Sequence, residues 1–110
     1  MNKYHNKKVT YNGLVFDSKH EAERWAELCW LRKANKIACL KRQVKFVLQD
    51  SFKKNGKTIR ESAYIADFVY YDKETGQVVV EDAKGMKTDV YKIKKKMFEK
   101  RYPELTIKEV

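Results

Sequence analysis

The chain has 110 residues, of which 43% are hydrophobic and 36% are charged. A chain of this length builds one modest core, so we expect a single folded domain over residues 1–110, and its hydrophobic fraction excludes a disordered polymer. The formal net charge of +10 favours a polyanionic partner, nucleic acid before an anionic membrane, because the field of a small basic domain attracts such surfaces.

Membrane insertion and secretion are not expected. No apolar run approaches the roughly 20 residues that a spanning helix requires. The basic start, residues 1–8, is not followed by the apolar segment of a secretory signal, which predicts a cytoplasmic protein. Cys29 and Cys39 are the only cysteines, and their spacing suits neither a redox pair nor a zinc site, so we interpret both as reduced thiols.

A β-hairpin is predicted first. An Asn-Gly pair lies between two β-prone triplets in residues 9–16, which is the strongest short-range hairpin signal. Ser18 then begins a helix, because Glu21 follows at the spacing of a capping box and apolar residues recur at helical intervals to about Ala34.

Three strands are predicted next. Residues 37–49 alternate polar and apolar side chains with the period of a strand. Residues 58–71 resume β-rich sequence after a polar stretch with an Asn-Gly turn, and residues 78–84 are too short and too β-branched for a good helix. The turn-forming residues 72–77 make the second and third strands a tight hairpin.

The chain ends with a second helix and a short strand. Thr88 or Asp89 begins the helix, Pro103 ends it, and residues 105–110 alternate as a strand does. After the opening hairpin the order is helix, three strands, helix, strand. This order predicts an α+β fold with an αβββαβ core, in which helices flank a mixed four-stranded sheet.

The predicted hairpin brings two carboxylates together. If residues 73–76 form a four-residue loop, Asp72 pairs with Gln77. Stepping back five positions along the two strands then places Asp67 opposite Asp82 on one face of the sheet.

This pairing indicates a metal site. Like charges directly opposite each other destabilise a sheet, so Asp67 and Asp82 need a compensating role. Mg²⁺ or Mn²⁺ binds to one or two carboxylates while phosphate and water complete its shell, and it activates bound water. Lys84 shares the face and can orient the attacking water or neutralise charge on the phosphate, whereas Glu81 is expected to point outward from the other face.

These residues carry a family resemblance. Glu21 on a first helix, Asp67 on a second strand, then Asp82 and Lys84 on a third, resemble the PD-(D/E)XK nuclease superfamily, whose restriction-endonuclease-like core is also αβββαβ. The resemblance implies that Asp67, Asp82 and Glu21 hold the metal. It implies that Lys84 is the catalytic lysine. Two departures are Ala66, where the superfamily name has proline, and Asp82, where glutamate is commoner.

A closer likeness concerns the sequences around the two aspartates. Residues 64–70 and 80–85 look like a bacteriophage and prophage family of small proteins that are generally taken to be endonucleases and are sometimes likened to Holliday-junction resolvases. The likeness implies a metal-dependent endonuclease that acts on branched or recombination-intermediate DNA in a phage or prophage setting. Cutting both strands requires two active sites, so it also implies a homodimer.

The second helix is the candidate DNA-binding surface. Its basic residues are interleaved with aromatic ones, and the predicted contacts are Tyr91, Lys92, Lys94 and Lys95. The competing interpretation is an ordinary solvated helix face with apolar anchors. Glu21 likewise has a competing role as the second partner of the capping box.

Two other functions stay open. The first is a non-catalytic DNA-binding accessory protein, against which the clustered carboxylates argue because they repel phosphate. The second is a nuclease that acts on RNA or single strands, which nothing in the sequence excludes.

Overall fold

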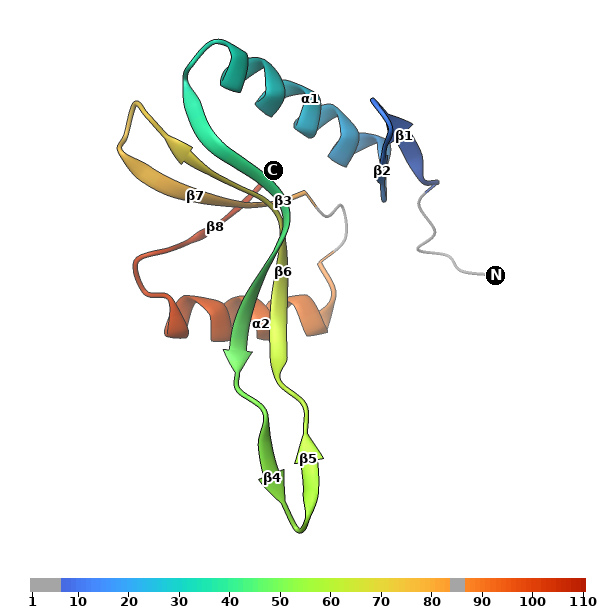
Figure 1. Ribbon diagram of the computed structural model, residues 1–110, viewed down its shortest axis with the longest axis vertical. Coiled ribbons are helices and arrows are strands. Elements are labelled where there is room, and N and C mark those ends of the chain that lie inside the picture. The colour runs from blue at the N-terminus through green and yellow to red at the C-terminus, as the bar shows by residue number, and fades with distance from the viewer. Residues whose placement is uncertain (1–6, 84–86) are drawn as a thin grey trace.

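A mixed four-stranded sheet lies at the centre of the computed structural model, which describes residues 7–83 and 87–110 (Figure 1). In spatial order, its strands are β3 (Ile37–Gln49), β6 (Ser62–Asp72), β7 (Gln77–Asp82) and β8 (Ile107–Glu109). Strand β6 is antiparallel to both of its neighbours, β3 and β7, and β8 is parallel to β7. The predicted α+β fold and its mixed sheet are confirmed.

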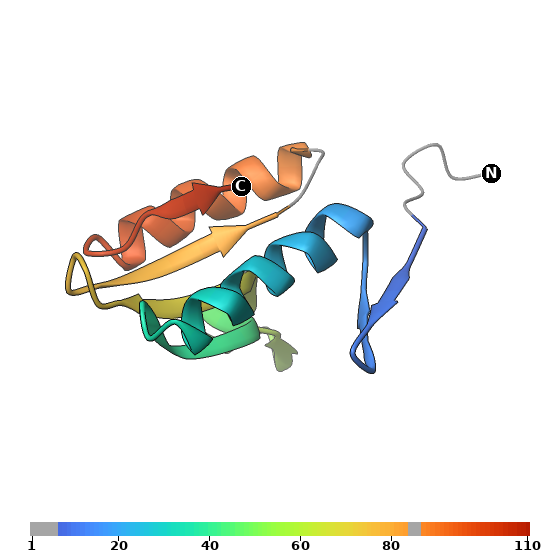
Figure 2. The same cartoon turned by 90° about the horizontal axis from the view of Figure 1, so that it is seen from above.

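Helices flank this sheet. In the described part of the chain these are α1 (Lys19–Lys33) and α2 (Asp89–Arg101), and β7 lies between them (Figure 2). Neither helix is long and apolar enough to cross a membrane.

Both helices begin at a capping hydroxyl. Ser18 Oγ accepts a hydrogen bond from the Glu21 amide at 3.1 Å, and Thr88 Oγ1 accepts one from the Tyr91 amide at 3.1 Å. Such bonds satisfy amides that the first turn of a helix leaves without intrahelical partners. Of the two starts that the sequence allows for the second helix, the structure uses Thr88 as the cap.

Two short hairpins are built on Asn-Gly turns. The predicted opening hairpin is present as β1 (Val9–Tyr11) and β2 (Leu14–Phe16). The second turn joins β4 (Phe52–Lys54) and β5 (Lys57–Ile59), which project beyond the central sheet (Figure 1). The expected second strand, residues 58–71, is therefore divided into β5 and β6. In both turns the asparagine and the glycine have positive φ, which these two residue types tolerate best.

The core consists of two groups of buried side chains. The group beside α1 comprises Phe16, Ala22, Leu28, Ile37, Phe68, Tyr70 and Ala83. The group beside α2 comprises Leu48, Tyr64, Ala66, Val80, Tyr91, Phe98 and Ile107.

Strand β6 contributes to both groups. Tyr64 and Ala66 pack beside α2, whereas Phe68 and Tyr70 pack beside α1. Residues two apart on a regular strand face the same side, so β6 changes the face that it buries at Asp67. The central candidate residue therefore lies at an irregular point of the sheet.

Candidate active site

The hairpin of β6 and β7 has the register that the loop length predicted. Asp72 pairs with Gln77, and the ladder continues without a shift for five pairs. The ladder ends at the Phe68–Glu81 pair, and one further step in the same register would place Asp67 opposite Asp82. Asp67 also accepts a hydrogen bond from the amide of Ala83, the residue after Asp82, so the two predicted metal ligands lie near each other.

Both carboxylates are buried and receive hydrogen bonds. Asp67 is 4% exposed and Asp82 is 2% exposed. Asp67 Oδ2 accepts a hydrogen bond from the Ala83 amide at 2.7 Å, so this side chain reaches across to the chain after β7. Asp82 Oδ2 accepts a hydrogen bond from the Tyr64 hydroxyl, also at 2.7 Å. These bonds to ionised acceptors hold the carboxylates in place.

Gln43 of β3 also lies beside the aspartates, where it contacts Asp67. The pairs on either side of it place Gln43 opposite Asp67, and its Nε2 lies 3.4 Å from Asp67 Oδ1. Gln43 has φ +52°, an uncommon backbone conformation for its residue type that often marks functional positions. Gln43 was not among the predicted site residues because polar residues on a strand usually face solvent. Its backbone conformation and contact appear only in the tertiary structure.

Glu21 is both a helix-cap residue and a buried acid. Its amide makes the predicted capping bond to Ser18, and the residue is only 5% exposed. Glu21 Oε1 lies 3.9 Å from Arg42 Nη2 on β3, and the Arg42 guanidinium lies 4.2 Å from the centre of the Phe16 ring. The first turn of α1 therefore brings Glu21 to β3, one residue from Gln43.

A divalent ion at this site would be bound mainly by the two aspartates. Lys84, the predicted catalytic lysine, lies outside the described residues. Within residues 7–83 and 87–110, no three or more His, Cys, Asp or Glu side chains form a group that could hold a metal ion. Asp67 and Asp82 still fit Mg²⁺, because this ion binds through one or two carboxylates and keeps waters or phosphate oxygens as its other ligands.

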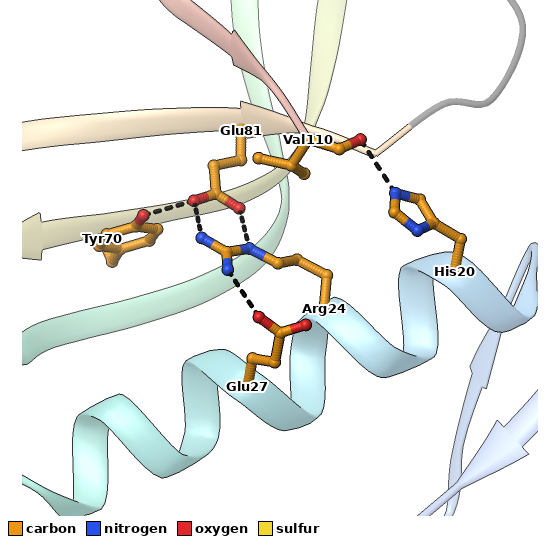
Figure 3. Close-up of polar contacts among 6 residues, drawn as sticks. All are labelled: His20, Arg24, Glu27, Tyr70, Glu81 and Val110. Carbon is orange, nitrogen blue, oxygen red and sulfur yellow. Dashed lines mark hydrogen bonds and ion pairs between the residues drawn. The ribbon is translucent and has the colours of Figure 1, made fainter.

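The opposite face of β7 holds a buried ion pair (Figure 3). Glu81 is 0% exposed, and Arg24 of α1 donates to both of its carboxylate oxygens, at 2.8 and 2.6 Å. The Tyr70 hydroxyl also donates to Glu81, and Arg24 contacts Glu27 on its other side at 3.0 Å. The hydrogen bonds to Glu81 raise the pKa of Arg24. The expectation that Glu81 points outward is wrong, because α1 covers this face of the sheet.

The comparison with known families concerns the whole chain. Residues 1–110 match the model of a family described as "Protein of unknown function (DUF1064)". The chain belongs to this family. Searches of curated proteins and of solved structures gave no match. The description states no activity, so the resemblance to the nuclease superfamily stays a prediction.

The predicted DNA contacts of this DUF1064 chain lie in different environments on α2. Tyr91 is only 5% exposed and its hydroxyl donates to Glu109 at 2.8 Å, so its ring packs in the core. Lys92 and Lys95 line one open depression, whereas Lys94 lines another beside Tyr64, the hydrogen-bond partner of Asp82. The three lysines and Tyr91 therefore remain candidate contacts, and Tyr91, although only 5% exposed, lines both depressions.

The depression beside Lys92 is basic but partly neutralised. Its lining includes four lysines and two acids: Lys87, Lys92, Lys95, Lys96, Glu99 and Glu109. Glu109 lies 3.2 Å from Lys87 and 3.6 Å from Lys95. The pKa of Glu109 is lowered mainly by the hydrogen bond that it accepts from Tyr91, and further by its contacts with these two lysines. Lys87, Lys92, Lys96 and Glu109 are the exposed members of this set.

Three buried tyrosines predict a loss of stability in alkaline solution. Burial raises the pKa of Tyr64, Tyr70 and Tyr91 above the ordinary value of 10.0, and hydrogen bonds to carboxylates add to the shift. Below pH 10 these phenols are neutral in both folded and unfolded chains. Above it, the unfolded chain loses the protons first. The free energy of unfolding then falls by up to about 1.4 kcal/mol per pH unit for each tyrosine.

Urea titrations between pH 8 and pH 11 test this expectation. The Tyr64→Phe variant should show a shallower decline than the parent chain above pH 10, because one ionising group has been removed. Tyr11→Phe, at an exposed position of β1, is the matched control and should decline as the parent does. If the free energy of unfolding of Tyr64→Phe fell as steeply with pH as that of the parent chain, Tyr64 would not have a raised pKa in the folded chain.

Proposed function

We propose that this chain is a metal-dependent DNA endonuclease of the PD-(D/E)XK type. The observation that carries the proposal is the position of Asp67 and Asp82, two buried carboxylates at the end of the β6–β7 ladder, where Asp67 accepts a hydrogen bond from Ala83, the residue after Asp82. A sheet gains nothing in stability from such a pair, since like charges directly opposite repel. A divalent cation converts this repulsion into attraction. The sequence also places Lys84 two residues after Asp82, as a nuclease of this type requires.

The chain's own residues have separate tasks in the proposed reaction. Asp67 and Asp82 would hold Mg²⁺ or Mn²⁺ through carboxylate oxygens; the resemblance also assigns Glu21 to the metal, although the three acids do not form one group among the described residues. When bound, such an ion would lower the pKa of a coordinated water and stabilise negative charge on the phosphate. Lys84 orients the attacking water or neutralises charge that develops on the phosphate oxygens.

Neighbouring groups prepare the two aspartates for this role. The Tyr64 hydroxyl orients Asp82, and the Ala83 amide orients Asp67. A tyrosine phenol is protonated at neutral pH, so Tyr64 donates to Asp82, and burial raises its pKa further. Ligands that are held in position before the substrate arrives lose less entropy on binding the ion.

The charge of the chain supports a nucleic-acid substrate. Its net charge of +10 attracts polyanions from solution, and each lysine that contacts a phosphate adds to affinity by releasing counterions. We propose branched or recombination-intermediate DNA as the substrate, in a phage or prophage setting. This part of the proposal rests on the resemblance to small resolvases. A homodimer supplies the second active site that paired cutting needs.

A cleavage panel tests the proposed activity. The purified chain is incubated with a labelled four-way junction, a flap, a linear duplex and single-stranded DNA, each in Mg²⁺, Mn²⁺ or EDTA, together with a single-stranded RNA. We expect cutting with either metal and none in EDTA, and faster cutting of the junction than of the duplex.

The panel also separates this function from its rivals. Preferential cutting of RNA or single strands would show that the proposed substrate class is wrong, while the proposed metal site would stand. Tight DNA binding without cutting in any metal would overturn the enzyme and favour an accessory DNA-binding protein. Sedimentation at cleavage concentrations measures the oligomeric state, for which we expect a dimer.

A further inference from the structure

The β4–β5 arm, residues 51–60, is a projecting basic surface distinct from the aspartate pair. All ten of its residues are exposed. It contains four cationic side chains and no acidic one: Lys53, Lys54, Lys57 and Arg60. Figure 1 shows that the arm extends from the ends of β3 and β6, away from α1. A surface of this charge and shape attracts polyanions.

The acids beside the arm pair with cations at its base. Asp50, just before the arm, lies 3.5 Å from Arg101 of α2, and Glu61, just after it, pairs with Lys45 of β3. Arg101 also donates to the Leu48 carbonyl at 3.1 Å, which ties α2 to the base of the arm. The arm's own positive charge is therefore not neutralised by its flanking carboxylates.

The arm is narrow and poorly suited to a purely structural role. In the described chain, β4 and β5 form a two-stranded sheet of their own. Lys54 lies opposite Lys57, a pairing of like charges that destabilises a hairpin, while the exposed pair Phe52 and Ile59 supports it. An isolated two-stranded hairpin is marginal in water, so a ligand that neutralises the lysines would stabilise it.

We propose that the β4–β5 arm inserts into the major groove of B-form DNA. This inference rests on the proposed nucleic-acid function and specifies how the chain contacts its substrate. The major groove is about 12 Å wide and admits a two-stranded ribbon, whereas the major groove of duplex RNA is deep and narrow. The lysines contact the phosphates on either side, and the narrow Asn55-Gly56 turn leads into the groove.

The length of the strands sets where this contact falls. Gly56 and Asp67 are separated by eleven residues, which span at most about 36 Å at 3.3 Å per residue. One turn of B-form DNA is about 34 Å long. The arm therefore contacts the duplex at most about one helical turn from the aspartate pair, so a duplex segment of about ten base pairs on that side is sufficient for the contact.

Fluorescence anisotropy in EDTA tests the arm without cleavage. Parent and Lys54→Ala/Lys57→Ala chains are titrated with a 24-base-pair DNA duplex and the RNA duplex of the same sequence, at several salt concentrations. Loss of two phosphate contacts is expected to weaken DNA binding roughly tenfold near 0.1 M salt and to reduce the magnitude of the salt slope by about 2. Binding of duplex RNA should change much less.

A matched control and the other outcomes keep the test decisive. Lys33→Ala/Lys36→Ala removes the same charge near the end of α1, at the opposite end of β3, and should change DNA affinity less than about twofold, because salt screens distant charges. Unchanged DNA binding by the arm variant, or equal losses on DNA and RNA, would each overturn the proposal. If the arm variant loses DNA binding while the parent cuts no substrate in Mg²⁺, the arm stands and the endonuclease proposal falls.

Discussion

Replacement of Asp82 by asparagine is expected to lower the rate of metal-dependent DNA cleavage by roughly a hundred- to a thousand-fold, the usual cost of losing one preorganised electrostatic group. Asparagine keeps the shape of the side chain, and its carbonyl oxygen can still accept the hydrogen bond from Tyr64. It loses the negative charge that holds the cation. Asp67→Asn and Lys84→Ala should cause losses of similar size. The measurement is the initial rate on a labelled junction in Mg²⁺.

Asp72→Asn is the matched control for this experiment. Asp72 lies on β6, the strand of Asp67, at the far end of the β6–β7 ladder, where it pairs with Gln77 of β7. Its Oδ1 accepts a hydrogen bond from the Glu74 amide at 2.9 Å in the turn, away from the aspartate pair. The control should cleave at the parental rate. Full activity in Asp82→Asn, with parental circular dichroism and melting temperature, would remove Asp82 from the proposed site.

Replacement of Arg24 by leucine is expected to reduce the free energy of unfolding by about 3–5 kcal/mol. The reason is that Glu81 is fully buried, and removing its partner leaves a carboxylate without its cation in the core. Urea denaturation followed by circular dichroism gives this value, provided that the slope of the transition is unchanged.

Two further variants distinguish the stability that the buried Arg24–Glu81 ion pair contributes from that of the surface Arg24–Glu27 pair. Arg24 also contacts Glu27, whose side chain is 64% exposed, so Glu27→Gln should cost less than about 1 kcal/mol. Combining Arg24→Leu with Glu81→Leu removes both buried charges and should recover much of the lost stability. If Glu27→Gln and Arg24→Leu destabilised the chain equally, the contact of Arg24 on the helix surface, rather than its buried pair with Glu81, would account for the loss of stability.

The buried pair and the aspartate site are adjacent along β7. Glu81 and Asp82 are consecutive residues whose side chains point to opposite faces of the sheet, where Arg24 holds one and Tyr64 contacts the other. We therefore expect the Arg24 variant to lose some cleavage activity as well, at temperatures where it remains folded, because the end of β7 positions Asp82.

Local patterns were sufficient for much of this architecture. The Asn-Gly turn of residues 12–13, the Ser18 cap and the β6–β7 register depend on neighbours a few residues apart, and each was predictable because turn chemistry and capping are short-range effects. The pairing of Asp72 with Gln77 follows from loop length alone, since a four-residue loop sets the register of both strands.

The tertiary structure decided which faces of these elements are covered. Glu81 looked like an outward residue because the sequence does not show that α1 packs on that side with Arg24 in reach. Tyr91, a predicted DNA contact, also packs in the core, which its basic neighbours in the sequence do not reveal. Gln43 meets Asp67 through a non-local strand pairing and a positive φ. Composition, turns and caps are local and could be read from the sequence, whereas burial and contacts between distant residues depend on how the elements pack.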